Sequence, residues 1–274
     1  MSPDNFDILA RLVHRRAGIV LTQDKRALIE RRLVPVMRRF GFKDRAQLMR
    51  ELRLGHEALA ACVTEAMTVN ETSFFRDADL FARLGTEILP SLLAARAKEK
   101  RLRIWSAACA AGQEAYCIAM MLDSLGLARE GWNIELIATD ISAEAIARAE
   151  RGFYSTFETQ RGLSDGDLAV WFRAEEGGHA IASHLRGMVR FRRFNLLDSY
   201  GWLDDLDLVL CRNVLIYFDG ATKASVLERI AETMAPHGML VVGETETAPS
   251  GLYRALPGGD GIYARVPVRR LKSA

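Results

Sequence analysis

The chain has 274 residues, enough for one large or two modest domains, and its 49% hydrophobic and 26% charged residues are ordinary values for a globular protein. A formal net charge of +2 is too small to predict nucleic-acid binding for the chain as a whole. No apolar run is long enough to span a bilayer, and the N-terminus has no apolar region of a secretory signal. The four cysteines form no CxxC pair and stand among apolar neighbours, so we expect reduced, buried thiols in a cytoplasmic protein.

The first part of the chain has the pattern of a small helical bundle. Apolar residues recur at helical spacing within residues 4–18 and 22–41, each segment with a polar residue at its start and a glycine at its end. Pro35 should kink or split the second helix, because proline has no amide hydrogen to donate. Two shorter helices are expected within residues 44–67. We therefore predict an all-helical N-terminal domain over residues 1–75.

Residues 22–43 carry an excess of basic side chains, with seven Lys or Arg against two acids and a local balance of +5. The basic residues are Lys25, Arg26, Arg31, Arg32, Arg38, Arg39 and Lys43. Such a stretch can be a docking face for an acidic partner. Charge alone equally allows a solvated helix face.

From residue 76 onward, short apolar segments alternate with helical ones, which predicts an α/β domain over residues 76–274. We expect a doubly wound, mostly parallel sheet with helices on both faces. The expected strands are residues 102–109, 134–141, 189–197, 206–218 and 239–246, with a helix over 222–238 and a closing hairpin over 251–256 and 261–268. Residues 157–190 are too long for a plain connection, so an inserted element is expected there, around Gly177 and Gly178.

Ligands of open α/β sheets bind beyond the carboxyl ends of the strands, so the residues that follow each strand are the candidates for a site. After the first strand, the small residues of "SAACAAGQE" allow a close approach of the backbone to a ligand, and Gly112 permits a tight turn. Close packing would explain these small residues equally well. Glu114 follows near a helix N-terminus, where the helix dipole also favours a purely structural carboxylate.

Asp140 ends the second strand, where an acid can accept hydrogen bonds from both hydroxyls of a ribose. A cap for the next helix is the alternative, although Ser142 can fill that role. The G-x-G-x-x-G fingerprint of dinucleotide enzymes is missing, and no Gly-Lys-Ser/Thr loop is present for a nucleoside triphosphate. Because a sulfonium nucleoside needs no phosphate cradle, the pattern favours S-adenosylmethionine (SAM) over NAD or ATP.

The third and fourth strands are followed by further candidates. Asn195 and the backbone of Leu196 can bind an adenine edge, and a turn-forming asparagine is the alternative. The segment "CRNVLIYFD" lacks the Asn/Asp-Pro-Pro-aromatic element that amino-methylating enzymes often carry at this position, which argues against a nitrogen acceptor. Within it, Tyr217 can place a phenol beside the reacting group or can be an aromatic core residue.

Six segments, in this order, resemble CheR-type chemotaxis receptor methyltransferases: "NETSFFRD", "RIWSAACAAGQEAYCIAM", "IATDISAEAIARAERGFY", "FNLLD", "CRNVLIYFD" and "GMLVVGETE". The resemblance covers nearly the whole chain, and it implies a class I SAM-dependent methyltransferase that esterifies glutamate side chains on the cytoplasmic helices of chemoreceptors. It also implies a small antiparallel β-subdomain within residues 157–190. We expect SAM as the cofactor, chemoreceptor cytoplasmic domains as partners, and a monomer that uses no metal, binds no nucleic acid and does not insert into a membrane.

The resemblance also implies which residues form the site. In the family, the segment that corresponds to "NETSFFR" joins the two domains and contacts the cofactor; Phe74 and Phe75 would anchor it in an apolar seam. The positions that match cofactor contacts are Asn70, Thr72, Arg76, Glu114, Asp140, Asn195, Leu196, Arg212 and Asn213. Arg76 and Tyr217 match the pair near the transferred methyl group. Two residues depart from the family pattern: Cys109 and Gln113 stand where family members often have Ser or Ala and Glu, and Gln113 removes one carboxylate from this loop.

The chemistry of this reaction makes small demands on the enzyme. A glutamate side chain has a pKa near 4.3 and is ionised at neutral pH, so neither a general base nor a metal is required. The enzyme must align the carboxylate oxygen, the methyl carbon and the sulfur. Arg76 can position the carboxylate, and Tyr217 can donate a hydrogen bond to it.

The alternative to this enzymatic function is a SAM-binding signalling module without methyltransferase activity.

Overall fold

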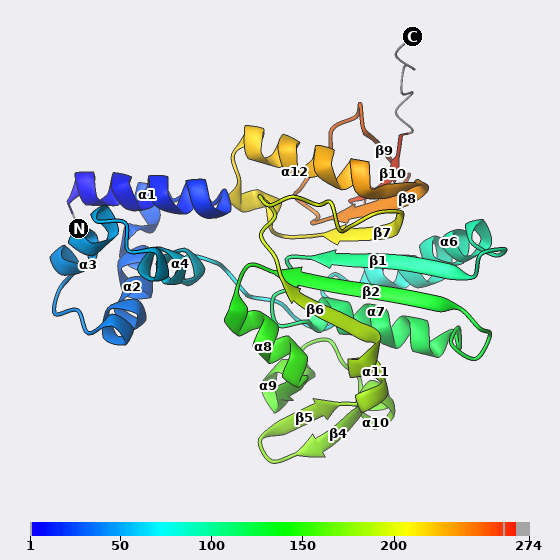
Figure 1. Cartoon of the computed structure of the whole chain (residues 1–274). Coiled ribbons are helices and arrows are strands. Elements are labelled where there is room, and N and C mark those ends of the chain that lie inside the picture. Colours follow the sequence, from blue (N-terminus) through cyan, green and yellow to red (C-terminus); the bar gives the residue numbers. More distant parts are fainter. Residues whose placement is uncertain (1, 260, 267–274) are drawn as a thin grey trace, which may run out of the picture. The chain divides into compact units, whose positions relative to one another are not determined.

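The computed structural model describes residues 2–259 and 261–266, and the chain divides into two compact units. The first unit contains the residues up to Val69 together with Tyr217–Lys223, and the second contains Asn70–Ile216 and the residues from Ala224 onward. Figure 1 shows the elements of both. Residues 267 and 268, which the sequence analysis placed in the closing hairpin, lie outside the described residues.

The first unit is all-helical, as predicted. Its elements are α1 (Pro3–Ala17), the 3₁₀ turn η1 (Gln23–Lys25), α2 (Arg26–Phe40), α3 (Arg45–Arg53) and α4 (Glu57–Ala66). Its core is made of apolar residues at helical spacing, among them Leu9, Val13, Leu33, Leu48, Leu59 and Val63. Pro35 was expected to kink or split this helix, and of these two outcomes the split does not occur, because α2 runs through the residue. Leu33 and Val36 on either side of it are buried, so packing holds the helix together across the missing hydrogen bond.

The second part of this unit, Tyr217–Lys223, is held by the end of α1 and the residues after it. Phe218 forms an antiparallel bridge with Ile19, and the Val20 N–H donates to the Tyr217 carbonyl oxygen at 2.8 Å. Two residues further on, Asp219 Oδ2 lies 2.6 Å from Nε2 of His14. The backbone around Tyr217 is therefore fixed by contacts with the helical unit.

The second unit is built on a seven-stranded sheet in the order β6-β2-β1-β7-β8-β10-β9. The strands are β1 (Arg101–Ala107), β2 (Asn133–Asp140), β6 (Val189–Arg193), β7 (Leu206–Cys211), β8 (Met234–Val242), β9 (Tyr253–Ala255) and β10 (Ile262–Arg265). The first five pair in parallel, whereas β10 is antiparallel to both of its neighbours. The predicted doubly wound, mostly parallel fold and the closing hairpin are confirmed.

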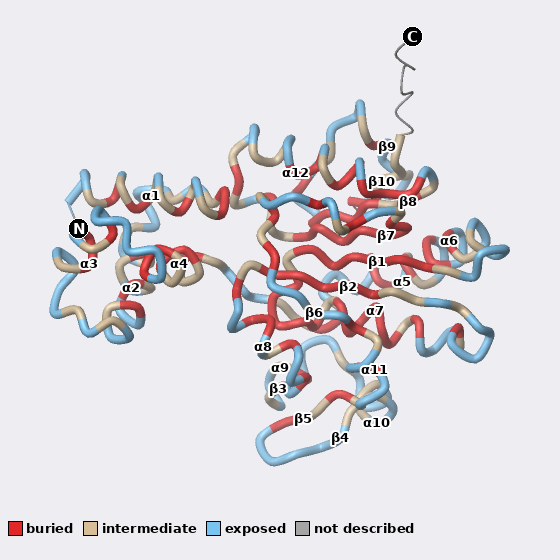
Figure 2. The backbone as a smooth tube through the Cα atoms, in the orientation of Figure 1, coloured by how far each residue is buried: buried red, intermediate tan, exposed pale blue. Residues whose placement is uncertain are grey.

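Helices cover the sheet, and Figure 2 shows its central strands as buried. The helical elements are α5 (Ala78–Arg83), the π-helix η2 (Leu84–Ile88), α6 (Leu89–Ala95), α7 (Gln113–Ser124), α8 (Ala143–Arg151), α11 (Ser183–Met188), η3 (Leu215–Tyr217) and α12 (Gly220–Thr233). Ile104 of β1 packs in a cluster with α5 and α7, and the neighbouring Trp105 packs edge-on against Tyr200. Because successive side chains of a strand point to opposite faces, both faces of β1 are buried.

The helix expected over residues 222–238 ends earlier, at Thr233, and Met234–Gly238 already belong to β8. Met234 pairs with Leu206 of β7 across an irregularity in the register, and that pairing extends the strand backwards. Gly238, the last residue of the expected helix, therefore lies within a strand. No helix within the described ranges is long and apolar enough to cross a bilayer.

The inserted segment forms a separate three-stranded sheet in the order β3-β5-β4, which we call the small sheet. Its elements are β3 (Phe153–Ser155), α9 (Thr156–Gln160), α10 (Asp165–Trp171), β4 (Phe172–Glu175) and β5 (Gly178–Ile181). All its pairings are antiparallel, and the turn between β4 and β5 lies at Gly177, where the sequence predicted the insertion. The expected small antiparallel sheet is confirmed.

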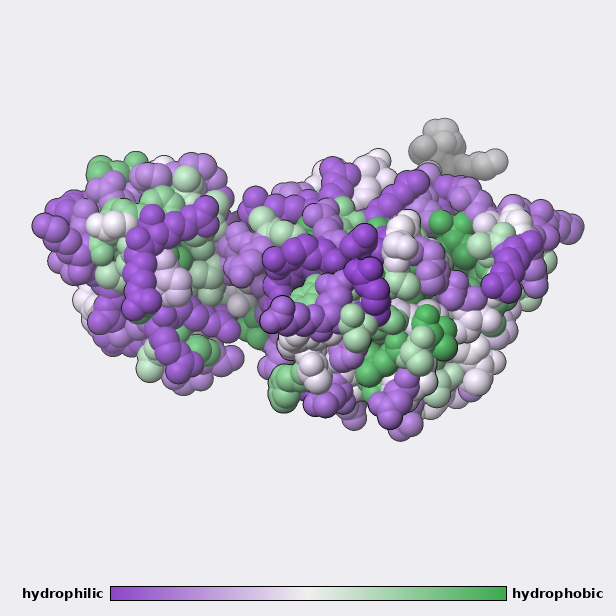
Figure 3. Space-filling view, turned by 90° about the horizontal axis from the view of Figure 1, so that it is seen from below, coloured by the Kyte–Doolittle hydropathy of each residue, from purple (hydrophilic) through white to green (hydrophobic). Residues whose placement is uncertain are grey.

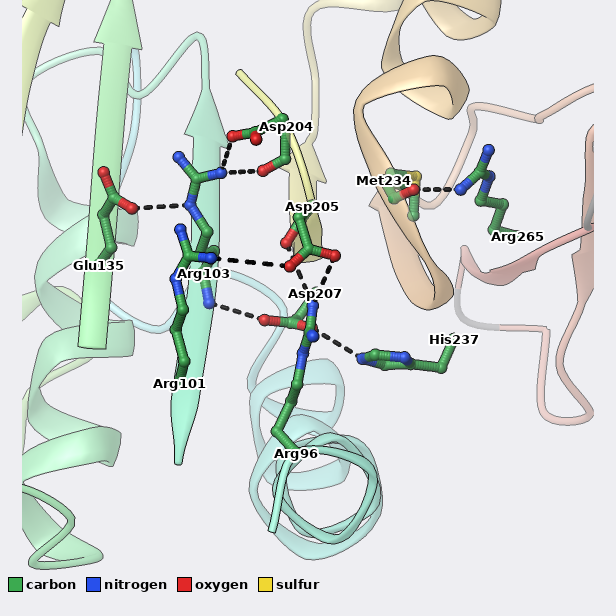
Figure 4. A network of polar contacts seen from close by, with 10 residues as sticks. All are labelled: Arg96, Arg101, Arg103, Glu135, Asp204, Asp205, Asp207, Met234, His237 and Arg265. Atoms are coloured by element: carbon green, nitrogen blue, oxygen red, sulfur yellow. Dashed lines mark hydrogen bonds and ion pairs between the residues drawn. The ribbon is translucent and has the colours of Figure 1, made fainter. Parts of the chain in front are cut away.

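At the amino-terminal ends of the central strands lies a network of paired charges (Figure 4). Its centre is Asp207 of β7, which is fully buried. Oδ1 accepts hydrogen bonds from Arg96 Nε at 2.7 Å and His237 Nε2 at 2.8 Å, and Oδ2 accepts one from the Arg103 backbone N–H at 2.7 Å. Arg103 in turn donates to Glu135 at 2.7 Å. This network ties α6, β1, β2, β7 and β8 together.

Candidate functional site

The carboxyl ends of the three central strands meet at one edge of the sheet. Ala107, the last residue of β1, lies beside Thr139 of β2 and Cys211 of β7 in the parallel register. The order of the strands reverses here, because β2 follows β1 on one side and β7 follows on the other. Such a switch point is the usual ligand position in open α/β sheets. We call it the carboxyl edge.

The loop that leaves β1, residues 108–112, is held in an unusual conformation. Ala108 and Ala110 have φ angles of 58° and 50°, and Gly112 has one of 91°. An alanine in this left-handed region costs about 1 to 2 kcal/mol, so neighbouring contacts must stabilise the loop. The Cys109 N–H donates to the Thr139 carbonyl oxygen at 2.8 Å, and the Ala110 N–H donates to Asp140 Oδ2 at 2.9 Å.

Gly112 meets a further requirement of this loop. A Cβ at this position would lie 2.8 Å from Cβ of Ala149 and 3.1 Å from the Phe191 ring. The positive φ angle and this close approach together require glycine at the start of α7.

Asp140, at the end of β2, is buried and oriented by the backbone. Its Oδ2 accepts from the Ala110 N–H, and its Oδ1 accepts from the Ser142 N–H at 2.9 Å. Ser142 itself caps α8 by accepting a hydrogen bond from the Ala145 N–H. These backbone donors fix the orientation of the carboxylate at the end of β2. A carboxylate held in this way can form a bidentate contact with a pair of hydroxyls.

Glu114 and Arg212, far apart in the sequence, form a buried ion pair. Arg212 Nη1 lies 2.9 Å from Glu114 Oε2, and Ser106 donates to the other carboxylate oxygen at 2.7 Å. Arg212 Nη2 also lies 2.5 Å from Asp77 Oδ2 and donates to the Arg76 carbonyl oxygen at 3.0 Å. The guanidinium therefore connects β7, α7 and the segment before α5. The structure brings these two predicted cofactor residues together through their own ion pair.

Residues 70–77, which we call the joining segment, run from the end of the helical unit to α5. Phe74 is buried in the main core of the second unit, and Phe75 packs edge-on against Phe81. The Phe75 N–H donates to Sγ of Cys117 at 3.0 Å. The polar residues of the segment differ from this pair, because Asn70 and Arg76 are exposed and Thr72 is half-buried. Aromatic anchors thus fix a segment whose polar side chains reach solvent.

Among the described residues, the Arg76 guanidinium has no ion-pair partner, in contrast to Arg212.

Asn195 follows β6, and its Oδ1 accepts a hydrogen bond from the Leu197 N–H at 3.0 Å, which closes a local turn. The neighbouring Leu196 is buried, and its carbonyl oxygen accepts from the Tyr200 hydroxyl at 3.0 Å. Both alternatives for Asn195, a turn and an adenine contact, are compatible with this geometry.

Asn213 follows β7 in the left-handed region, with a φ angle of 57°, and its backbone is held by Glu246. Glu246 Oε2 accepts from the N–H groups of Asn213 at 2.8 Å and Gly243 at 2.7 Å, and Oε1 accepts from Ile216 at 3.0 Å. This buried carboxylate therefore fixes the backbone that leads to Tyr217. The sequence analysis missed Glu246, although it follows β8 and the rule applied to the other strands would have found it.

Three of the four thiols are buried at or near the carboxyl edge. Burial raises the pKa of Cys109, Cys117 and Cys211 above the usual range of a thiol. These thiols therefore stay protonated at neutral pH, and none of them is suited to act as a nucleophile.

Two family models match the chain. The CheR methyltransferase all-alpha domain matches residues 4–68, and the CheR methyltransferase SAM binding domain matches residues 70–255. The chain belongs to the CheR methyltransferase family. SAM is its cofactor, as expected from the sequence.

Curated relatives agree with this assignment to the CheR methyltransferases. Chemotaxis protein methyltransferase 1 of Pseudomonas aeruginosa is 39% identical over 248 residues, which are 88% of this chain and 89% of the relative. Chemotaxis protein methyltransferase Cher2 of Pseudomonas putida is 36% identical over 255 residues, with 90% and 92% covered. The chemotaxis protein methyltransferase of Escherichia coli is 32% identical over 271 residues, with 96% and 91% covered. The likeness extends over both units of the CheR chain.

The carboxyl edge of this CheR chain fits the cofactor chemically. Asp140 is a buried carboxylate held by the main chain at this edge, where it can accept hydrogen bonds from ribose hydroxyls, and SAM needs no phosphate cradle. Gln113 is buried, and its Oε1 has no hydrogen-bond partner within the described residues. A buried acceptor without a donor is costly, and the ammonium group in the methionine part of SAM is a donor of the kind that it lacks. Gln113 is a second candidate that the sequence analysis did not assign to the cofactor.

Proposed function

We propose that this CheR methyltransferase transfers the methyl group of SAM to glutamate carboxylates on the cytoplasmic helices of chemoreceptors. The observation that carries the proposal is the similarity over most of the chain to proteins named chemotaxis protein methyltransferases. Because the proposed acceptors are cytoplasmic helices of chemoreceptors, the proposal includes a cytoplasmic location for this enzyme. We further propose a monomer whose functional domains divide at about residue 75.

The chain's own residues would bind and align the reactants. When bound, SAM supplies an electrophilic methyl group on a sulfonium. Asp140 would hold the ribose, and Asn195 with the Leu196 backbone would bind the adenine edge. The remaining proposed contacts are Asn70, Thr72, Arg76, Glu114, Arg212 and Asn213. The Arg212–Glu114 pair at 2.9 Å supports a role in keeping the joining segment against the end of β7.

Arg76 and Tyr217 would orient the acceptor. The exposed guanidinium of Arg76 can form a charge-assisted hydrogen bond with the incoming carboxylate, and the phenol of Tyr217 can donate a second one. A tight pair with Arg76 would also lower the nucleophilicity of the carboxylate. Arg76 would therefore act by positioning the substrate rather than by activating it.

The basic stretch of the helical unit supplies a candidate surface for the receptor helix. A groove of about 600 Å³ lies along α2, with Ala27, Val34 and Met37 as its apolar part. Its basic residues are Arg31, Lys43 and Arg45. Of its acids, Glu30 is paired with Arg26 and Arg45, and Asp44 caps α3. In the view of Figure 3 the surface of this unit is largely hydrophilic, with small apolar areas. An acidic amphipathic helix suits such a groove.

Not every residue of the basic stretch is available for docking. Arg32 Nη1 donates to the carbonyl oxygens of Met67 and Thr68, each at 3.0 Å, and thereby holds the end of α4. Arg39 Nη1 donates to the Cys62 sulfur at 3.4 Å. Arg31 and Arg38 are exposed. A test of docking should therefore change Arg31 and Arg38 and leave Arg32 intact.

The proposal is tested by incubating the enzyme with tritiated SAM and purified chemoreceptor cytoplasmic domains. We expect label on the receptor domain that is released as methanol by mild base, as an ester requires. Label that survives base, or label absent from every receptor domain while SAM still binds, would contradict the glutamate assignment. The second result would favour a SAM-binding signalling module.

The same assay tests the docking surface. Arg31→Glu with Arg38→Glu should raise the KM for the receptor domain about tenfold and leave SAM affinity unchanged, because rim charges act mainly on encounter and alignment. Arg50→Glu is the control, since Arg50 is also exposed but lies on α3 outside the basic stretch. Equal effects of the two changes would remove the groove from the proposal.

A further inference from the structure

We propose that Tyr154, on strand β3 of the small sheet, is a positioning residue for SAM that acts through the loop of residues 108–112. The proposal rests on the assignment to the cofactor, under the proposed function, of the joining segment and of Asp140, to which this loop is bonded through the Ala110 N–H. It gives the small sheet a part in cofactor binding, in addition to any contact that it makes with a receptor.

The hydroxyl of Tyr154 reaches the loop directly. The side chain is fully buried, and the hydroxyl donates a hydrogen bond of 2.7 Å to the Ala111 carbonyl oxygen. Burial raises the pKa of Tyr154 well above its usual range, so the hydroxyl remains a donor throughout the physiological range. Two other bonds hold this loop from the sheet side, to the Thr139 carbonyl oxygen and to Asp140. Tyr154 adds a bond that comes from the small sheet.

The loop has a particular need for such a bond. Ala108 and Ala110 both occupy the left-handed region, which alanine rarely adopts. A conformation of this kind persists only where the surrounding contacts over-determine it. Ala111 lies between Ala110 and the required Gly112, so a bond to its carbonyl oxygen fixes the peptide plane at the centre of the strained stretch.

The ring of Tyr154 also contacts the joining segment. It packs edge-on against Phe74, with ring centroids 4.9 Å apart, and Phe172 of β4 packs edge-on against Phe74 at 5.5 Å. The segment lies very close here, because a Cβ on Gly162 would stand 1.9 Å from the Phe74 carbonyl oxygen. Phe74 is thus enclosed by the small sheet, two residues before Arg76. One side chain, Tyr154, therefore touches both the joining segment and the loop that is bonded to Asp140.

The chain contains a matched comparison for this residue. Tyr116 is also fully buried, and its ring centroid lies 6.3 Å from that of Tyr154. Its hydroxyl donates a hydrogen bond of the same length, 2.7 Å, to a backbone carbonyl oxygen. That carbonyl belongs to Ala149 of α8, outside the loop of residues 108–112. The two tyrosines therefore differ in what they hold, while their burial and hydrogen-bond length are alike.

The test compares Tyr154→Phe with Tyr116→Phe, each of which deletes one buried hydroxyl. Titration calorimetry would measure the Kd for S-adenosylhomocysteine, and thermal unfolding would measure the Tm. We expect both variants to lose a similar few degrees in Tm. Tyr154→Phe should raise the Kd about three- to tenfold, whereas Tyr116→Phe should change it by less than about twofold. Tyr154→Leu, which also removes the ring contact with Phe74, should raise the Kd further.

Unchanged affinity in Tyr154→Phe, or equal weakening in both phenylalanine variants, would overturn the proposal, since a general loss of stability would then explain the data. If Tyr154→Leu fails to fold, the phenylalanine pair still decides the question. Asp140→Ala serves as the reference for the site itself. Loss of binding in Asp140→Ala with normal binding in Tyr154→Phe would contradict the role of Tyr154 alone. Normal binding in Asp140→Ala would contradict the site assignment on which the role of Tyr154 rests.

Discussion

The two ends of the central strands hold their buried aspartates in different ways. At the amino-terminal end, Asp207 is surrounded by donors that include two cationic or ionisable side chains, Arg96 and His237 (Figure 4). At the carboxyl edge, the carboxylates of Asp140 and Glu246 accept instead from backbone N–H groups. The first arrangement joins elements by side chains, and the second orients acids with the main chain.

The backbone shows a weaker form of this contrast. Five residues other than glycine with a positive φ angle lie in the joining segment, in the loop after β1 and after β7, namely Phe75, Asp77, Ala108, Ala110 and Asn213, whereas two, Lys100 and Asp205, precede β1 and β7 at the amino-terminal end. Strain of this kind is retained where the geometry serves a function, because it costs stability. The comparison suggests that the amino-terminal network stabilises the fold, whereas the carboxyl edge binds the cofactor at some cost in stability.

Asp207→Ala should have the largest effect, and its effect should be on stability. Arg96 and His237 would lose their buried partner, and removing one member of a buried charge pair costs about 3 to 5 kcal/mol in free energy of unfolding. Urea denaturation would measure this loss. The folded fraction should still bind S-adenosylhomocysteine with a normal Kd. A raised Kd would show that the amino-terminal network also contributes to cofactor binding.

Asp140→Ala should have the opposite effect, with a large loss of cofactor affinity and a smaller loss of stability. Loss of two charge-assisted hydrogen bonds to the ribose should raise the Kd for S-adenosylhomocysteine about a hundredfold, measured by calorimetry. The Tm should change less than in Asp207→Ala, since Asp207→Ala leaves the largely buried Arg96 guanidinium without this partner. An unchanged Kd would remove Asp140 from the site.

Arg76→Ala separates an exposed cation at the carboxyl edge from the buried Arg212. Because Arg76 has no ion-pair partner among the described residues, its removal should leave the Tm within about two degrees of the wild-type value. Turnover of receptor domains should fall about ten- to a hundredfold, since the acceptor loses its positioning partner. Full turnover would contradict the proposed role.

Metal removal should have no effect at all. Within the described ranges, no group of three or more His, Cys, Asp or Glu residues is arranged to hold a metal ion. Because an ionised carboxylate needs no metal to act as the nucleophile, we expect an excess of chelator to leave the rate of methyl transfer unchanged in the tritium assay. Strong inhibition that zinc or magnesium reverses would show that the carboxyl-edge acids bind an ion.

The fold and the position of the site could be predicted from the sequence because both depend on local patterns of strands and helices. Alternating strands and helices place every residue that ends a parallel strand at one edge, so the position of Asp140 at the end of a strand was enough to assign it to this edge. The family resemblance added the joining segment, whose polar residues follow no such rule. The roles of the individual site residues stay predictions.

What the sequence did not predict depends on contacts between distant residues. Arg212 and Glu114 are 98 positions apart, and no spacing rule pairs them. The early end of α12 depends on the pairing of Met234 with Leu206, and the continuity of α2 through Pro35 depends on core packing. Tertiary contacts override local propensity in both cases.

A crystal structure of the enzyme with S-adenosylhomocysteine would test the central claim most directly. We predict that the nucleoside lies across the ends of β1, β2 and β7, with both ribose hydroxyls within hydrogen-bond distance of the Asp140 carboxylate. A product molecule bound at another surface, or bound at this edge with its ribose away from Asp140, would contradict the account.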